Sequence, residues 1–288
     1  MNMLKIGLAQ TKQVDDFDAN AETVLRFLEK AGKEGVQIVC FPEAQTVGYR
    51  ADIARPDTPV PVDRLEALHG EVARRCKALE MACILGTETP METDPLHGKP
   101  YNSALVIDET GKVLGVHHKT KLTPLDALAY TPGDSFETFE LFGVRVGVVI
   151  CFEGFRFAET TAECVRQGAQ VVFHPQNNTT RPNDWKIPIH QGMMVTRAAE
   201  NTIWFASCNA CLIPHQNCET RVVAPDGRIH ARVEMKRERL LVTDIDVDQA
   251  TRAMFRYDME DSAELLFAHT VKREEFAAIL PQKSHGKS

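Results

Sequence analysis

The sequence predicts an α/β fold, because short β-branched segments alternate along the chain with longer amphipathic ones. The amphipathic segments carry apolar residues at helical spacing. In residues 20–33, for example, Val24, Phe27, Leu28 and Ala31 fall on one face. The β-branched segments are numerous enough for large sheets, and their alternation with helices favours neither an all-β sandwich nor a helical bundle.

The elements follow in order from these patterns. The predicted strands are residues 4–9, 36–41, 82–87, 103–108, 113–117, 145–150, 170–174, 202–207, 220–224, 229–233 and 240–245, and the predicted helices are residues 20–33, 64–79, 157–167 and 187–200. Turns at residues 108–111 and 225–227 each join two strands, which indicates two related halves. No Pro- or Ser-rich linker separates the halves, so we predict a single domain over residues 1–280 and a frayed tail over residues 281–288.

Composition excludes several classes of protein. The chain has 288 residues, of which 43% are hydrophobic and 25% charged, as in ordinary globular proteins. A net charge of −7 gives no reason to expect a nucleic-acid partner. We expect no membrane partner either, because no segment reaches the ~18 consecutive apolar residues of a membrane span. Several of the eight cysteines lie in apolar runs, as Cys40 does, which favours reduced thiols and a cytoplasmic location.

Cys151 is the clearest candidate nucleophile. It follows the apolar strand 145–150 and precedes a polar-aromatic turn. The carboxyl end of a strand is where α/β folds usually place reactive groups. A buried structural thiol is the alternative, since most cysteines are inert.

Two charged residues occupy equivalent positions. Glu43 follows the strand 36–41 and a proline, and Lys119 follows the strand 113–117. If the three strands share a sheet direction, a carboxylate, an ammonium and a thiol converge at one edge. The alternative for both charged residues is a solvated position on the surface.

Three segments around these residues carry a resemblance to a known family. Phe41-Pro42-Glu43, residues 118–122 and residues 147–153 are similar, in order and spacing, to the signature segments of the nitrilase superfamily, the carbon–nitrogen hydrolases with a Glu-Lys-Cys triad. The likeness covers residues 6–246. It implies a four-layer α-β-β-α sandwich of two stacked mixed sheets flanked by helices, and a dimer joined through helices beside the nucleophile. We expect a homodimer or a higher homo-oligomer, and no cofactor or metal.

The resemblance implies a role for each site residue. Glu43 would act as the base for Cys151, because a thiol with a pKa near ~8.5 needs one at neutral pH. Lys119 and the backbone N–H of Phe152 would stabilise the oxyanion of the intermediate. Asp126 stands near the position of a second family glutamate and would support the charge of Lys119. A thioester intermediate would then be hydrolysed.

The predicted substrate is a small linear amide or an N-carbamoyl compound, which would release ammonia or an amine. A nitrile is the second choice, because Phe152-Glu153-Gly154 differs from the Trp-Glu-Asn-like pattern of true nitrilases. Glu153, Gln176 and Asn177 are expected to contact substrate, although the asparagines of the turn 174–178 fit an exposed loop equally well. The chain also departs from the usual family pattern at Lys121 and Ala158, and residues 151–159 are one residue longer than the common form.

Three other readings remain open. One compact run offers four potential zinc ligands: Cys208, Cys211, His215 and Cys218. The sequence has no second, widely separated pair of ligands to complete such a site. Cys151 could use His174 or His190 as its base, as Cys-His proteases do. Finally, the chain could be a catalytically silent binding protein that retains the fold.

Overall fold

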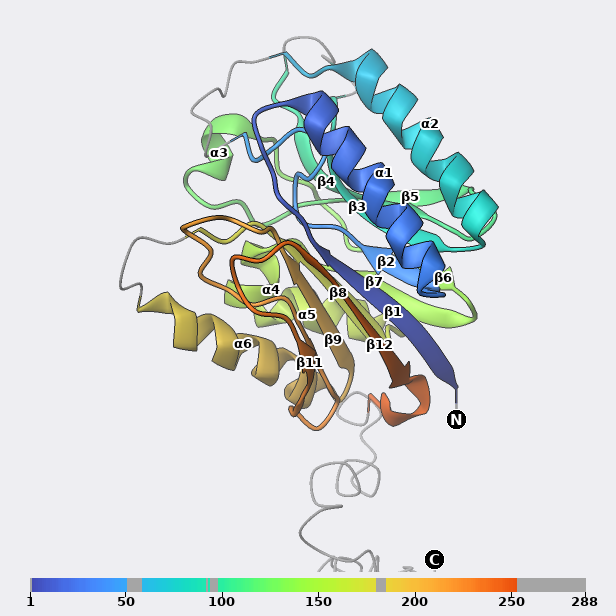
Figure 1. The fold of residues 1–288 in the computed structure, drawn as a ribbon. Coiled ribbons are helices and arrows are strands. Elements are labelled where there is room, and N and C mark those ends of the chain that lie inside the picture. Colours follow the sequence, from blue (N-terminus) through green and yellow to red (C-terminus); the bar gives the residue numbers. More distant parts are fainter. Residues whose placement is uncertain (1, 51–58, 92, 94–97, 180–184, 253–288) are drawn as a thin grey trace, which may run out of the picture.

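Two β-sheets packed face to face, with helices on both outer sides, form the body of the protein (Figure 1). The computed structural model describes residues 2–50, 59–91, 93, 98–179 and 185–252. Each sheet has six strands. The predicted α-β-β-α sandwich of mixed sheets is therefore confirmed.

The strands are β1 (Met3–Gln10), β2 (Ile38–Cys40), β3 (Ala82–Thr89), β4 (Tyr101–Ile107), β5 (Val113–His118), β6 (Thr138–Leu141), β7 (Val144–Val148), β8 (Val171–Gln176), β9 (Trp204–Asn209), β10 (Arg221–Val223), β11 (Ile229–Arg232) and β12 (Arg239–Asp246). The helices are α1 (Phe17–Lys33), α2 (Val62–Leu79), α3 (Asp126–Ala129), α4 (Phe152–Arg156), α5 (Ala158–Arg166) and α6 (Lys186–Asn201), followed by a 3₁₀ turn at Val247–Gln249.

The two sheets have the same internal pattern. The first runs β12-β1-β2-β3-β4-β5 and the second β6-β7-β8-β9-β10-β11 in space. In each, the second, third and fourth strands are parallel and the remaining pairings are antiparallel. The related halves expected from the two turns correspond to these sheets, although the last strand, β12, returns to the edge of the first.

Successive side chains of each strand point to opposite faces of the first sheet, so the sheet separates two hydrophobic layers. Ile38 and Cys40 face the second sheet, whereas Val39 and Phe41 pack beneath α1 and α2. Helix α1 turns Val24, Phe27, Leu28 and Ala31 inward, which are the residues that the sequence places on one face. Helices α5 and α6 cover the second sheet.

The sequence missed a few short elements. Strand β6 was not predicted, because its four residues alternate too briefly to give a signal. Helix α4 was not predicted either, because its five residues around Gly154 are too few to show apolar residues at helical spacing. The predicted single domain over residues 1–280 stays a prediction, and its end and the tail 281–288 lie outside the described residues.

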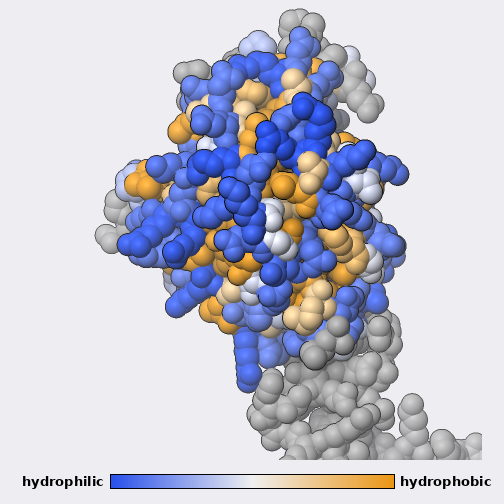
Figure 2. Space-filling view, turned by 45° about the vertical axis from the view of Figure 1, so that its right-hand side comes forward, coloured by the Kyte–Doolittle hydropathy of each residue, from blue (hydrophilic) through white to orange (hydrophobic). Residues whose placement is uncertain are grey.

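The surface gives no large continuous apolar area on the face drawn in Figure 2, where hydrophilic residues predominate and hydrophobic ones are scattered among them. Within the described part of the chain, no helix combines the length and apolar character needed to cross a membrane.

One close backbone contact aligns β2 with β3. A Cβ built on Gly86 of β3 would lie 1.7 Å from the carbonyl oxygen of Pro42 and 2.9 Å from Cα of Glu43. Only a glycine allows the segment after β2 to cross the sheet so closely. The position of residues 42–43 therefore depends on Gly86.

Gly86→Ala should lower the free energy of unfolding by about 1–3 kcal/mol, because backbone rather than a flexible side chain must move. Gly70→Ala in α2 is the matched control: its Cβ would meet open space. Alanine should stabilise the helix there by about 0.5–1 kcal/mol. Urea unfolding of both variants tests the pair, and equal midpoints would contradict the assignment.

Candidate active site

Glu43 lies at the end of β2, where Pro42 directs the chain out of the sheet, and its carboxylate is fully enclosed. Oε1 accepts hydrogen bonds from Lys119 Nζ at 2.6 Å and from Asn102 Nδ2 at 2.7 Å. Oε2 accepts from the backbone N–H of Asn177 at 2.9 Å. Both oxygens are therefore held in place by buried donors.

Lys119 follows β5 and is buried completely. Its ammonium also donates to Asp126 Oδ2 at 2.8 Å, so it lies between two carboxylates. Asp126 begins α3 and accepts further hydrogen bonds from the backbone N–H of Thr123, at 2.9 Å, and from the hydroxyl of Tyr49. The structure thus brings Glu43, Lys119 and Asp126 into one ion cluster.

Cys151 comes from the other sheet, because it follows β7. The convergence of the three side chains at one edge was expected on the condition that their strands share a sheet direction. In fact β2 and β5 run in the same direction in the first sheet, being related through the antiparallel strand β4, while β7 belongs to the second. The site therefore lies across the interface of the two sheets.

The backbone of Cys151 is strained, with φ 47° and ψ −102°. A non-glycine residue with positive φ costs free energy and often marks a functional position. The backbone N–H of Cys151 donates to the carbonyl of Pro175 at 2.9 Å, and Sγ lies 3.5 Å from Asn178 Nδ2. Because the adjacent N–H of Asn177 binds Glu43, two consecutive residues connect the sulfur with the carboxylate.

Burial and neighbouring charges shift the pKa values of Cys151, Glu43 and Lys119. Burial raises the pKa of the Cys151 thiol well above its ordinary value, and the negative charge of Glu43 adds to this. Burial also raises the pKa of Glu43, although Lys119 opposes the shift. Burial alone would lower the pKa of Lys119, but the negative charges of Glu43 and Asp126 hold it above its ordinary value. The site combines a neutral thiol, a carboxylate that protonates readily and a permanent ammonium.

Glu153 fastens the loops that carry Lys119 and Cys151. Oε1 accepts from the backbone N–H and the hydroxyl of Thr120 at 2.6 and 2.8 Å. Oε2 accepts from the backbone N–H of Ile150 at 2.5 Å and pairs with His117 Nε2 at 2.9 Å. Since every contact is internal and the side chain is fully buried, the geometry favours a positioning role over the expected contact with substrate.

The other two expected substrate contacts are also turned inward. Gln176 is buried behind Asn178, whose Nδ2 donates to its Oε1 at 2.6 Å. Asn177 offers its N–H to Glu43 and its amide to Gln13, while its buried Oδ1 has no partner among the described residues. Asn178 is the member of this turn that reaches the sulfur.

Sequence reasoning missed Tyr49 and Asn102. Tyr49 lies only six residues after Glu43, but nothing in the sequence shows that the loop folds back to Asp126. Asn102 is a polar residue near the start of the apolar strand β4, which was the available signal for a buried partner.

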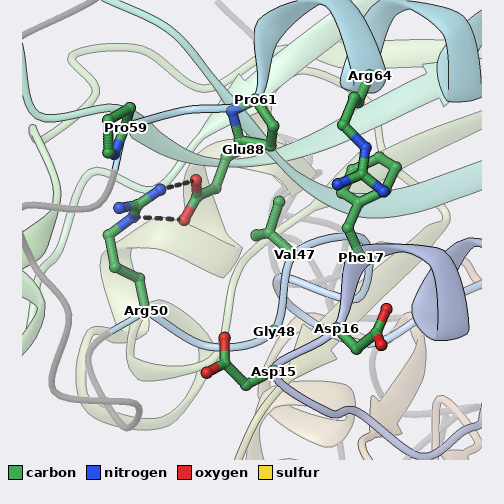
Figure 3. A pocket seen from close by; sticks show the side chains of 10 residues that line it. All are labelled: Asp15, Asp16, Phe17, Val47, Gly48, Arg50, Pro59, Pro61, Arg64 and Glu88. Atoms are coloured by element: carbon green, nitrogen blue, oxygen red, sulfur yellow. Dashed lines mark hydrogen bonds and ion pairs between the residues drawn. The ribbon is translucent and has the colours of Figure 1, made fainter.

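A hollow of about 210 Å³ adjoins the loop that carries Glu43 and Tyr49. Figure 3 shows Arg50 and Glu88 facing each other on one side of it, joined by hydrogen bonds of 2.9 and 2.6 Å. Both side chains are buried, so this two-pronged ion pair anchors the end of the loop to β3.

The family model for carbon-nitrogen hydrolases matches residues 5–254. The chain belongs to the carbon-nitrogen hydrolase family. This membership confirms the family predicted from the three signature segments.

Several known proteins are similar to this carbon-nitrogen hydrolase over most of its length. An omega-amidase of Homo sapiens is 26% identical, and the match covers 86% of this chain and 90% of the relative. A nitrilase of Pyrococcus abyssi is 29% identical, over 70% of this chain and 73% of the relative. The solved structure of a mutant amidase from Nesterenkonia sp. AN1, with the acetamide moiety of fluoroacetamide on its active-site cysteine, has a TM-score of 0.74 and 20% identity, and the match covers 88% and 92% of the two chains.

The geometry does not favour a histidine base in this carbon-nitrogen hydrolase. His174 Nε2 contacts the backbone carbonyl of Cys151 at 2.9 Å rather than its sulfur, and Nδ1 contacts Ser207 Oγ at 2.8 Å. His190 stacks on Phe155, with ring centroids 4.3 Å apart. The His174 ring therefore contacts the carbonyl of Cys151 and is not placed to accept the thiol proton.

The cysteine-rich run is not assembled as a metal site. Cys208 Sγ lies 3.3 Å from the carbonyl of Cys40, whereas Cys218 Sγ accepts from Gln176 at 3.6 Å. Over the described ranges, no three His, Cys, Asp or Glu side chains are grouped so that they could hold a metal ion.

Glu153→Gln should lower the free energy of unfolding by about 2–4 kcal/mol at pH 7, because the donors of Thr120, Ile150 and His117 lose their charged acceptor. Burial alone would raise the pKa of Glu153, but His117 and the N–H donors hold it below its ordinary value. The carboxylate therefore stabilises the fold above about pH 4.3, the ordinary glutamate pKa, and this contribution disappears as pH falls through the lower folded value.

Urea unfolding at pH 7 and pH 3 measures this difference. Glu66→Gln, on the exposed face of α2, is the matched control and should change stability by no more than about 0.5 kcal/mol. A Glu153→Gln deficit that stayed constant down to pH 3 would refute the electrostatic explanation.

Proposed function

We propose that this carbon-nitrogen hydrolase cleaves a small linear amide or an N-carbamoyl compound through a thioester on Cys151. The observation that carries the proposal is the buried cluster of Glu43, Lys119 and Asp126, linked to the sulfur of Cys151 through the turn at residues 177–178. The omega-amidase and amidase among its similar proteins support the choice of an amide.

In the first step, Sγ of Cys151 attacks the carbonyl carbon while Glu43 takes the thiol proton. Burial keeps the thiol neutral before attack, so a base is needed at that moment. The same burial raises the pKa of Glu43, which makes this carboxylate a better proton acceptor than an exposed glutamate.

Negative charge then develops on the former carbonyl oxygen. The ammonium of Lys119 is one donor available to it, and the backbone N–H of Phe152 is a second, because the first residue of a helix has no partner for its N–H within the helix. Lys119 stays protonated between Glu43 and Asp126, so its charge is already in place when the oxyanion forms.

Collapse of this intermediate breaks the carbon–nitrogen bond, and the protonated Glu43 returns its proton to the leaving nitrogen. Ammonia or an amine departs and the thioester remains. Glu43 next removes a proton from water, whose oxygen attacks the thioester carbon. The second collapse releases the acid, and the protonated Glu43 returns its proton to the sulfur, which restores the thiol of Cys151.

A nitrile is the second candidate substrate. The nitrilase of Pyrococcus abyssi among the similar proteins is the observation that favours it. Sγ would add to the nitrile carbon and the same carboxylate would protonate the nitrogen, so a substrate panel rather than the site distinguishes the two.

The compartment and the assembly also belong to this proposal. All eight cysteines are free and buried, which is the state expected in a reducing cytoplasm. We place the enzyme there and propose that it works as a homodimer joined through α5 and α6, the helices beside the nucleophile.

Cys151→Ala should lower the release of ammonia from the best substrate by about 10⁴–10⁶-fold, because no group replaces the nucleophile. A panel of linear amides, N-carbamoyl compounds and nitriles is tested with the wild type and the variant. Cys76→Ala, a cysteine of α2 outside the site, should keep wild-type turnover.

Mass spectrometry of the trapped acyl-enzyme should place the adduct on Cys151 alone. An adduct on another cysteine, or equal ammonia release from the wild type and Cys151→Ala, would exclude Cys151 as the nucleophile. A wild type that hydrolyses no member of the panel would favour the silent binding protein.

The pH profile tests Glu43 as the base. Its raised pKa predicts an acid limb of kcat/KM above about 4.3, the ordinary glutamate value, with activity rising as Glu43 loses its proton. The charge of Asp126 contributes to that raised pKa, so Asp126→Asn should move the limb to lower pH. Asp63→Asn, on the exposed side of α2, should leave it unchanged. An unmoved limb in Asp126→Asn would assign the titration to another group.

A further inference from the structure

A closed series of hydrogen bonds begins and ends on Cys151. The carbonyl of Cys151 contacts His174 Nε2 at 2.9 Å, and His174 Nδ1 contacts Ser207 Oγ at 2.8 Å. Gln176 Nε2 lies 2.6 Å from Ser207 Oγ, and Gln176 Oε1 lies 2.6 Å from Asn178 Nδ2. Asn178 Nδ2 then lies 3.5 Å from the sulfur of Cys151.

The direction of every bond in this series follows from its first member. A carbonyl oxygen can only accept, so His174 must carry a proton on Nε2. Burial lowers the pKa of His174 to about 4, which leaves the ring neutral and Nδ1 an acceptor. The hydroxyl of Ser207 therefore donates to His174 and is free only to accept from Gln176.

The remaining two bonds are then determined. Gln176 directs its NH₂ group at Ser207 and its carbonyl at Asn178, so Asn178 must present its own NH₂ group to Gln176. The second proton of that NH₂ group points to the sulfur of Cys151. An amide flip of Asn178 would set two carbonyl oxygens against each other, so the series holds Asn178 as a donor.

We propose that Asn178 is a further catalytic residue, whose side-chain N–H stabilises the negative charge on Cys151 Sγ as the proton leaves, with Gln176, Ser207 and His174 as positioning residues. This role rests on the proposed function, because it concerns the same nucleophile. The thiol proton goes to Glu43 and the sulfur lone pair forms the new bond to carbon, while Asn178 keeps both of its protons.

Rigid support makes this donor effective. Gln176, Ser207 and His174 are fully buried, and the backbone N–H of Asn178 donates to Asn209 Oδ1 at 2.9 Å. A donor that is already oriented needs no rearrangement when charge appears. Burial and the negative charges of Glu43 and Asp126 raise the pKa of Cys151 and so favour the neutral thiol. The Asn178 donor and the ammonium of Lys119 have the opposite effect, because both stabilise the thiolate.

Alkylation of Cys151 by iodoacetamide tests the donor without any assumption about the substrate. The thiolate displaces iodide and forms a thioether, so the rate follows the thiolate population. Peptide mass spectrometry separates Cys151 from the other cysteines. The full-length wild type and variants are alkylated between pH 6 and pH 10, and their thermal unfolding is recorded in parallel.

Asn178→Ala should slow alkylation of Cys151 about tenfold at neutral pH and raise its apparent pKa by about one unit, the size expected for one hydrogen bond to a charged acceptor. Asn178→Asp keeps the shape but replaces the donor by a carboxylate, so it should slow the reaction further. Ser207→Ala, which interrupts the series, should give a smaller effect in the same direction. Asn201→Ala, a buried asparagine whose amide binds the carbonyl of Arg197, is the matched control and should alkylate at the wild-type rate.

Wild-type alkylation in Asn178→Ala would overturn the proposal, and so would a wild-type rate in Asn178→Asp, because shape alone would then suffice. Equal slowing in Asn201→Ala would also overturn it, by pointing to general loosening. The two proposals can fail separately. If the wild type hydrolyses no substrate but its alkylation still depends on Asn178, only the proposed function is rejected. If the enzyme is active and Asn178→Ala changes neither alkylation nor hydrolysis, only the role of Asn178 as a donor is rejected.

Discussion

The ammonium of Lys119, enclosed between Glu43 and Asp126, is the interaction on which the rest of the site depends. A buried charge without partners would be unstable or would lose its proton. Here two carboxylates compensate one ammonium, and the extra negative charge contributes to the raised pKa of Glu43. The same arrangement that keeps the lysine charged therefore prepares a base, and removal of the ammonium would leave two buried carboxylates without their shared partner.

The repeated pattern of the two sheets explains how such distant segments meet. The loops after β2 and β5 leave the first sheet on one side, and the turn after β7 arrives from the second sheet. Gly86 allows the segment at Glu43 to cross close to β3, while Glu153 ties the loop after β5 to the turn at Cys151. Side chains outside the ion cluster thus determine where its members stand.

Two polar systems are linked to Cys151. The charged one includes Glu43 and Lys119, and the neutral one runs from His174 to Asn178 without any ionised group. Burial strengthens both, because hydrogen bonds and charges interact more strongly away from water. It also makes the thiol neutral at rest, so the site requires a base in the attack and benefits from donors that meet the charge as it forms.

Local patterns along the chain were enough to predict the α/β class, most strands, the long helices and the three signature segments, since periodicity and motifs are properties of neighbouring residues. The sequence also indicated Asp126 as a partner for Lys119. The packing of distant segments had to be seen before Cys151 could be assigned to the second sheet and Glu153 and Gln176 recognised as facing inward. The same holds for the contacts of Tyr49, Asn102 and Asn178 with the reacting groups. Those contacts join residues far apart in the chain or depend on the path of a loop, and such positions are set by packing between elements rather than by any local preference.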